Sequence, residues 1–130
     1  MSSRLKIVIA HLAQPPFNKS GDEQLDQLWQ EQILLGRNSN VWFDLSALPA
    51  FSGSEEYSYP MVRRYIHRAV GMVGAEKIMW GSDVPGLLSY ATYPQLLNLV
   101  IRHCDFLLPG ELEKVLGGNA WWVYGNAGQL

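Results

Sequence analysis

Apolar residues fall into short continuous runs that alternate with longer amphipathic stretches. The short runs cover residues 5–10, 41–46 and 78–80 and are rich in branched and aromatic side chains. Runs of this length and composition are typical of strands that are covered on both faces in a parallel sheet. The pattern therefore predicts three buried strands.

Between these runs, apolar residues recur at helical spacing. One helix is predicted to begin at residues 20–23 and to end at Gly36, and a second to run from Pro60 to Gly74. Both assignments use common start and stop signals: acidic or proline residues in the first turn and glycine after the last one. In the first helix we expect Trp29 to be a packing residue.

After the third strand the pattern predicts a loop and then further helices. One helix is expected at about residues 92–103, and a short one from Pro109 to residues 117–118. Asn119 is then predicted to cap a final turn that carries Trp121 and Trp122. Because adjacent residues do not share one helix face, we expect one of these tryptophans to be exposed.

The order strand-helix-strand-helix-strand-helix-helix places the strand ends at His11, Asp44 and Asp83, 33 and 39 residues apart. This spacing is that of βα units, which form right-handed crossovers and a parallel sheet. A closed βα barrel needs eight strands and about 250 residues. The sequence therefore predicts either a small open α/β domain or the last part of a βα barrel.

Length and composition predict a single domain over residues 1–130, since 48% of the residues are hydrophobic and 17% are charged. The net charge of -2 gives no indication of nucleic-acid or membrane binding. No signal-peptide pattern follows Met1, so we expect a cytoplasmic protein. Cys104 is the only cysteine. It is expected to be a small buried apolar residue, with a nucleophilic role as the alternative.

Polar residues follow each predicted strand, at the end where parallel α/β proteins place their chemistry. His11 is a candidate metal ligand or acid/base, or a structural histidine bound to a backbone carbonyl. Asp83 is a candidate catalytic carboxylate, or an acceptor of backbone N–H groups in its loop. Asp44 and Ser46 are two residues apart and point the same way. They either face a site or cap the following loop.

Other residues are candidates by location alone. Residues 50–59 are expected to form a long surface loop of the kind that often covers a site. Substrate contacts are predicted for Gln14 and Ser46, with Tyr57 and Tyr90 as further candidates. The arginines of the second helix are expected to form a solvated face, as is His67; these arginines are Arg63, Arg64 and Arg68.

Four segments, in order, resemble the C-terminal part of the amidohydrolase-related metal-dependent hydrolases. Residues 5–11 resemble the sixth barrel strand of that family, which ends in a catalytic histidine, and residues 40–46 fit the seventh. Residues 78–85 resemble the eighth strand, with its aspartate in a Gly-Ser-Asp-x-Pro setting. Residues 115–125 carry the Leu-Gly-Gly-Asn-Ala signature that closes these chains. The branch that this pattern resembles includes aminocarboxymuconate semialdehyde decarboxylase.

The resemblance implies a partial (β/α)8 barrel, made of strands six to eight plus closing helices. It also implies that Asp83 is a metal ligand, most simply to Zn²⁺, and that His11 is the acid/base or carbonyl-polarising histidine. The implied activity is metal-dependent hydrolysis or decarboxylation of a small organic substrate. Zinc lowers the pKa of bound water towards about 7, which suits a carboxylate that takes its proton.

The chain departs from the family pattern at three points. The His-x-His pair of the first strand and the histidine of the fifth strand are absent, and His67 and His103 lie on predicted helices. Where the family tends to have glycine after the strand-six histidine, this chain has Leu12 and Ala13. The metal cage of this chain is therefore predicted to be incomplete.

Two hypotheses follow. Either the chain belongs to a metal-dependent enzyme whose missing strands come from a partner, self-association or a longer polypeptide, or it is a non-catalytic barrel remnant that serves as an interaction or assembly module. A small open-sheet binding domain outside the family is a third alternative. It has no Gly-rich phosphate loop to support it.

Overall fold

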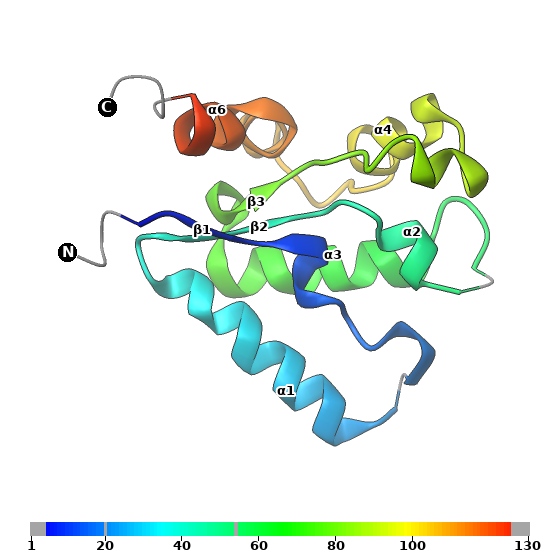
Figure 1. The fold of residues 1–130 in the computed structure, drawn as a ribbon, viewed down its shortest axis with the longest axis horizontal. Helices are drawn as coiled ribbons and strands as arrows, with labels where there is room; N and C mark the ends of the chain where they lie inside the picture. Colours follow the sequence, from blue (N-terminus) through cyan, green and yellow to red (C-terminus); the bar gives the residue numbers. More distant parts are fainter. Residues whose placement is uncertain (1–4, 20, 54, 126–130) are drawn as a thin grey trace.

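The computed structural model describes residues 5–19, 21–53 and 55–125. Three parallel strands form one sheet in the order β1-β2-β3 (Figure 1). The strands are β1 (Ile7–Ile9), β2 (Val41–Asp44) and β3 (Ile78–Met79). The predicted parallel α/β architecture is therefore confirmed for the described residues.

Each strand is shorter than its apolar run. At the third strand the reason is visible in the hydrogen bonds: the backbone N–H of Trp80 donates to the carbonyl of Val115 (2.8 Å) and not to β2. The next backbone N–H of the neighbouring strand, that of Leu45, still donates to the carbonyl of Met79 (2.8 Å). At Trp80 the C-terminal helical segment thus replaces β2 as the hydrogen-bond partner of the backbone N–H.

Six α-helices surround the sheet in the described parts of the chain, joined by short helical turns. The helices are α1 (Glu23–Leu34), α2 (Leu48–Phe51), α3 (Pro60–Val73), α4 (Tyr93–Ile101), α5 (Pro109–Glu113) and α6 (Asn119–Tyr124). The short turns are η2 (Ala10–Ala13), η3 (Phe17–Lys19), η4 (Leu35–Arg37), η5 (Ala75–Lys77), η6 (Gly86–Ser89) and the π-helical η7 (Lys114–Gly118). None of the described helices is long and apolar enough to span a bilayer.

Side-chain caps explain where two of the helices begin. The Asp22 carboxylate accepts the backbone N–H groups of Gln24 and Leu25, both at 3.1 Å, and so starts α1. Thr92 and Gln95 form a reciprocal capping box at the start of α4. Caps of this kind supply partners for backbone N–H groups that a helix leaves unpaired. Both helix starts agree with the prediction from sequence.

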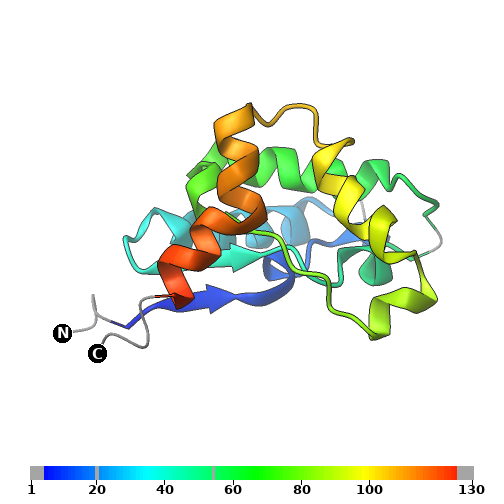
Figure 2. The ribbon, with the colours of Figure 1, turned by 90° about the horizontal axis from the view of Figure 1, so that it is seen from above.

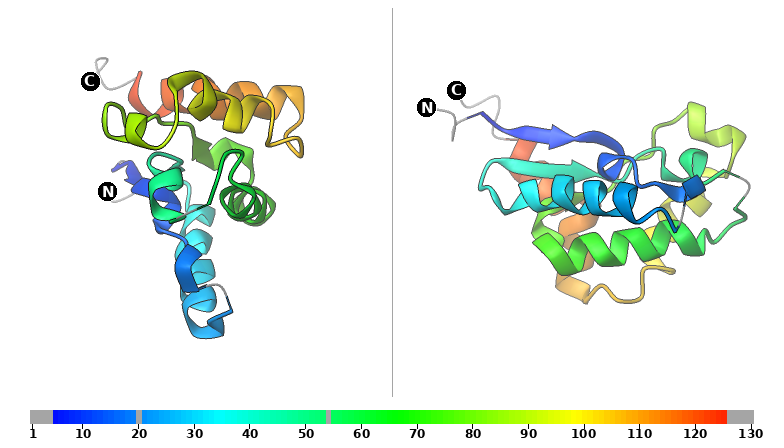
Figure 3. Two further views of the ribbon diagram at one scale, coloured as in Figure 1. Left: turned by 90° about the vertical axis from the view of Figure 1, so that its right-hand side faces the viewer. Right: turned by 90° about the horizontal axis from the view of Figure 1, so that it is seen from below.

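The sheet separates two apolar layers. Helices α1 and α3 lie side by side against one face, as Figures 1 and 3 show, and their buried side chains pack with Phe43 and Ile78. On the opposite face α6 crosses the strands (Figure 2), where its Val123 packs with Trp42 and Met79. Successive β2 residues therefore point into different layers, as the alternation of strand side chains requires.

The expectation that the first strand is buried on both faces is wrong. Strand β1 pairs only with β2, and Ile7 is 41% exposed and Leu5 66% exposed. An edge strand keeps one row of backbone groups unpaired and has fewer neighbours to cover its side chains. The apolar run is therefore suited to a second neighbouring strand that the described residues do not provide.

The predicted end at Gly117 and the cap at Asn119 are also wrong. Residues 109–124 are helical throughout, and the two glycines lie in the π-helical turn between α5 and α6. Asn119 is buried within the helix, and its Nδ2 donates to the carbonyls of Ala75 (2.7 Å) and Ile78 (2.8 Å). Asn119 therefore ties the C-terminal helix to the start of β3. Both Trp121 and Trp122 are exposed, against the expectation of one.

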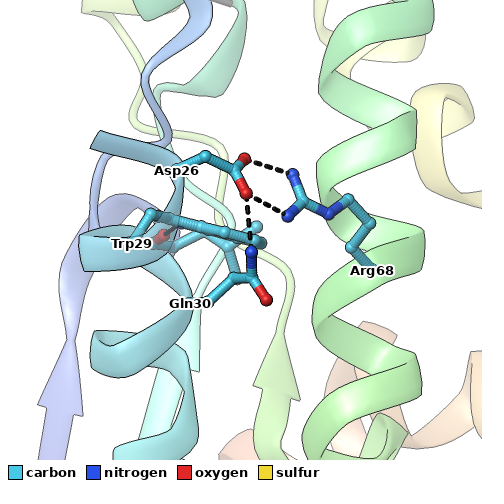
Figure 4. Close-up of polar contacts among 5 residues, drawn as sticks. Asp26, Trp29, Gln30 and Arg68 are labelled. Carbon is cyan, nitrogen blue, oxygen red and sulfur yellow. Dashed lines mark hydrogen bonds and ion pairs between the residues drawn. The ribbon is translucent and has the colours of Figure 1, made fainter. Parts of the chain in front are cut away.

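The predicted solvated arginine face is only partly correct. Arg68 is half-buried and makes a two-point ion pair with Asp26 of α1, at 2.7 and 2.8 Å (Figure 4). Its guanidinium also lies 4.9 Å from the ring centroid of Trp29. Arg64 and His67 are exposed, as expected. The loop predicted over residues 50–59 begins later, because α2 continues to Phe51.

Candidate active site

The backbone after β1 turns in an unusual direction at His11. The φ angles of residues 11–14 are all between 49° and 57°, which is the left-handed region. For residues other than glycine this conformation costs about 1–2 kcal/mol each. Tertiary contacts hold it: Leu12 is fully buried, and its carbonyl accepts the indole N–H of Trp29 at 2.9 Å. Leu12 and Ala13, which follow His11 where the resembled family tends to have glycine, adopt a conformation that glycine favours.

The side chains at the ends of β1 and β2 form one hydrogen-bonded cluster. Asp44 Oδ1 accepts the backbone N–H of His11 (2.9 Å), the backbone N–H of Ser46 (3.1 Å) and the hydroxyl of Ser46 (2.6 Å). His11 Nδ1 lies 2.9 Å from the carbonyl of Ser46 and 3.0 Å from its hydroxyl oxygen. The structure thus brings together three residues that the sequence placed at strand ends.

The cluster is half-buried and partly covered by an aromatic ring. His11, Asp44 and Ser46 are each of intermediate exposure, and the ring centroid of Phe51 lies 5.2 Å from that of His11. Phe51 was not among the predicted site residues. No signal in the sequence distinguishes it from other aromatic residues of its loop. Its position depends on the short helix α2, which begins after Ala47 in the left-handed conformation.

Asp83 lies at the same end of the sheet, in the loop after β3, and is exposed. Its φ angle is 54°, and its backbone carbonyl accepts the N–H of Leu87 at 3.2 Å. The loop reaches the cluster at Gly81, where a Cβ atom would lie 3.2 Å from that of Ser46. The described contacts therefore connect Asp83 to the cluster through Gly81, not through its carboxylate.

The other predicted contact residues lie elsewhere. Gln14 is exposed and lines a groove of about 260 Å³ against α1, together with Leu25 and Gln32. The hydroxyl of Tyr57 is 3.0 Å from His103 Nε2. The hydroxyl of Tyr59 donates to the carbonyl of Tyr90 at 3.3 Å. Of the predicted substrate contacts, only Ser46 belongs to the hydrogen-bonded cluster.

Burial raises the pKa of two further titratable groups. It raises the pKa of the Cys104 thiol to about 12, so that the thiolate nucleophile is not formed at neutral pH. The predicted buried, apolar role of Cys104 is therefore supported. Burial also raises the pKa of Tyr124, and the negative charge of Asp44 adds to this effect. The C-terminal helix thus lies within electrostatic reach of the cluster.

A separate polar cleft of about 630 Å³ lies between α1 and α3 and is lined by residues that include Asp26, Arg64 and Arg68. The Arg68 guanidinium holds the pKa of the Asp26 carboxyl below its usual range. None of the cluster residues lines this cleft. We therefore place the candidate active site at the strand ends and not between the helices.

The described residues do not fit a metal centre of their own. They contain no group of three His, Cys, Asp or Glu side chains close enough to share an ion. Catalytic zinc is usually held by three protein ligands. The predicted role of Asp83 as a metal ligand therefore requires further ligands from outside the described residues.

The fold is a parallel α/β fold. A histidine, a serine and two carboxylates lie at the ends of its strands, where proteins of this class place their chemistry. A model of the family described as "Amidohydrolase" matches residues 3–125, which is nearly the whole chain. The chain belongs to this amidohydrolase family. The resemblance noted from the strand-end and closing motifs is thereby confirmed at the level of the family.

Relatives and solved structures agree with this assignment. The L-fucono-1,5-lactonase of Burkholderia ambifaria is 33% identical over 125 residues, which are 93% of this chain and 42% of the lactonase. An amidohydrolase from Burkholderia multivorans, solved with bound zinc, superposes with a TM-score of 0.81 at 23% identity, over 93% of this chain and 44% of that protein. The 5-carboxyvanillate decarboxylase of Sphingomonas paucimobilis superposes with a TM-score of 0.56 at 16% identity, over 94% of this chain and 34% of the decarboxylase.

The chain thus spans under half the length of the relatives that it matches. The likeness to the two solved structures shows a shared fold. The activity, the metal and the partner that these proteins suggest are considered below as proposals.

Proposed function

We propose that this chain forms part of the active site of an amidohydrolase-family enzyme that hydrolyses a small organic substrate of the sugar-lactone class. The observation that carries the proposal is the His11-Asp44-Ser46 cluster at the ends of adjacent parallel strands. The lactonase relative supports a lactone over other substrates, because it is 33% identical to this chain, whereas the decarboxylase structure is 16% identical. Decarboxylation is the alternative reaction within the family.

In lactone hydrolysis, water adds to the carbonyl carbon, the ring C–O bond breaks and the ring oxygen takes up a proton. In our proposal His11 accepts the proton of the attacking water and later returns it to the leaving oxygen. An acid/base residue of this kind contributes about 10²–10⁴-fold to the rate. Asp83 is exposed in the loop after β3, at the same end of the sheet, and is proposed to contact the reacting water.

We further propose that β1, β2 and β3 correspond to the last three strands of an eight-stranded barrel. The parallel order of the strands and the superposition on just under half of a larger relative support this assignment. The exposed edge of β1, with Leu5 and Ile7, is then the contact for a preceding strand. The remaining strands would come from a partner chain or from a longer polypeptide.

The proposal can be tested in a chimera in which this chain replaces the matching segment of the Burkholderia ambifaria lactonase. We expect hydrolysis of L-fucono-1,5-lactone, with a loss of about 10²-fold or more on His11→Gln or Asp83→Asn. His67→Gln and Asp105→Asn are matched controls on exposed residues and should retain activity.

Zinc content, measured by elemental analysis, should be close to one ion per chimera and should fall in Asp83→Asn. A chimera that folds but does not hydrolyse the lactone would contradict the proposed substrate. Full activity in both site variants would contradict the assigned residues. A folded, inactive chimera that is indifferent to both changes would favour the alternative, a non-catalytic assembly module.

A further inference from the structure

The hydrogen bonds of the cluster determine which nitrogen of His11 carries a proton. His11 Nδ1 lies 2.9 Å from the backbone carbonyl oxygen of Ser46. A carbonyl oxygen can only accept a hydrogen bond, so the shared proton belongs to Nδ1. In neutral His11, this contact favours the tautomer with its proton on Nδ1.

The hydroxyl of Ser46 strengthens the same preference. Its oxygen is 2.6 Å from Asp44 Oδ1, and an ionised carboxylate only accepts hydrogen bonds. The single hydroxyl proton is therefore directed at Asp44. The hydroxyl oxygen then has only lone pairs to offer His11 Nδ1, which lies 3.0 Å away. Both neighbours of Nδ1 act as acceptors.

Asp44 also fixes the backbone that carries these groups. The same Oδ1 atom accepts the N–H groups of His11 (2.9 Å) and Ser46 (3.1 Å). It thereby joins the left-handed turn after β1 to the loop after β2. Among the residues that the structure describes, none is a hydrogen-bond partner of His11 Nε2.

We infer that Asp44 and Ser46 are positioning residues that hold neutral His11 as the Nδ1–H tautomer, with Nε2 free as a proton acceptor. This inference rests on the proposed function, because it supplies the form of His11 that the hydrolysis needs. In histidine the nitrogen that remains available is generally set by the hydrogen bond that the other nitrogen makes. Here a carboxylate acts on that choice through a serine hydroxyl and two backbone groups.

The tautomer can be read directly by NMR on the ¹⁵N-histidine-labelled chain. Two-bond ¹H–¹⁵N correlations distinguish a protonated ring nitrogen from a bare one, at about pH 8.5 where ordinary imidazoles are neutral. The chain has three histidines, so the loss of one signal set in His11→Gln assigns His11. We expect His11 to show protonated Nδ1 and bare Nε2. His67 is exposed and should show the Nε2–H form that imidazole prefers in water.

Variants separate positioning from a merely structural role. Asp44→Ala frees the Ser46 hydroxyl to donate to Nδ1, so the Nε2–H population of His11 should rise several-fold. Asp44→Asn keeps an oxygen that can accept the same hydrogen bonds, so it should change the tautomer less than Asp44→Ala does. Ser46→Ala keeps the backbone carbonyl and should change the tautomer less. The His67 signals should not change in any of these variants.

A wild-type His11 in the Nε2–H form would overturn the inference, and so would a tautomer that is unchanged in a folded Asp44→Ala variant. These outcomes are separate from those of the activity test. An inactive chimera with an Nδ1–H His11 would refute the proposed function and leave the positioning intact. An active chimera with an Nε2–H His11 would support the proposed function and refute the positioning.

Discussion

The two ends of the sheet use polar side chains in opposite ways. At the amino end, side-chain donors bind backbone carbonyls: Asn119 binds those of Ala75 and Ile78, and Lys77 binds those of Asn38 (2.9 Å) and Val41 (3.2 Å). These contacts pair the polar groups of the connections and hold the strands in register. The donor groups of these two side chains are thus engaged in hydrogen bonds within the fold.

At the carboxyl end, the polar side chains bind one another and keep reactive atoms available. Asp44 and Ser46 orient His11, while the carboxylate of Asp83 is exposed. The backbone there is in the left-handed region at His11 and Asp83. Residues held in sparsely populated conformations tend to occur at functional sites, where surrounding structure compensates for the cost. The comparison indicates that polar side chains stabilise the fold at the amino end of the sheet and form the candidate active site at the carboxyl end.

The largest stability effect is expected at the amino end, from Asn119→Ala. The change leaves the carbonyls of Ala75 and Ile78 without their buried donors, which should lower the free energy of unfolding by about 2–4 kcal/mol. Asn38→Ala is the control, because Asn38 makes a similar contact to a carbonyl but is exposed. Chemical denaturation measures both. Equal effects would show that Asn119 is not a structural anchor.

A smaller loss of stability is expected at the amino end of the sheet from Lys77→Met. Lys77 is only half-buried, so water can replace part of its hydrogen bonding when the ammonium group is removed. The variant also loses the contact of Nζ with the Trp42 ring, 4.6 Å from its centroid. We expect a loss of about 1 kcal/mol in denaturation experiments. A loss as large as that for Asn119→Ala would contradict the role of burial.

At the carboxyl end, a glycine substitution tests the strain in the turn. Ala13→Gly places glycine at a φ of 57° and should leave stability unchanged or raise it by up to about 1 kcal/mol. Ala120→Gly makes the same chemical change within α6 and should cost about 1 kcal/mol. Thermal unfolding of the pair gives the contrast. A loss of similar size in both variants would exclude a left-handed conformation at residue 13.

The smallest effect is expected from a polar contact that belongs to neither end, the Asp26-Arg68 ion pair. Asp26→Asn should lower stability by about 0.5–1 kcal/mol near neutral pH, because the pair is partly exposed. Arg68 lowers the pKa of Asp26 in the folded chain from the ordinary value of 3.8. The contribution is therefore complete above that value and is lost as the pH falls through the lower folded pKa. Denaturation at a series of pH values should show the wild type and the variant converging below pH 3.8.

Burial and contacts between distant segments explain where prediction from the sequence failed. The position of Asn119 in the sequence resembles that of a helix cap. Only the packing of α6 against β3 shows that its amide reaches two carbonyls at the start of β3. The apolar run of β1 predicts a fully buried strand, and the absence of a second described neighbour leaves Ile7 exposed. Arg68 was placed on a solvated face because its partner, Asp26, lies 42 residues earlier.

The sequence by itself determined the strand-helix alternation, the family, and the strand-end positions of His11, Asp44, Ser46 and Asp83. The alternation and the strand-end positions depend on local periodicity and on the common direction of parallel strands, and the family on the resemblance of four sequence segments to its motifs. Only the tertiary structure decided that Asp44 links His11 to Ser46 and that the turn at residues 11–14 is left-handed. The reason is physical: a hydrogen bond between strands, and a backbone conformation held by a buried leucine, arise only when segments distant in the sequence are packed together.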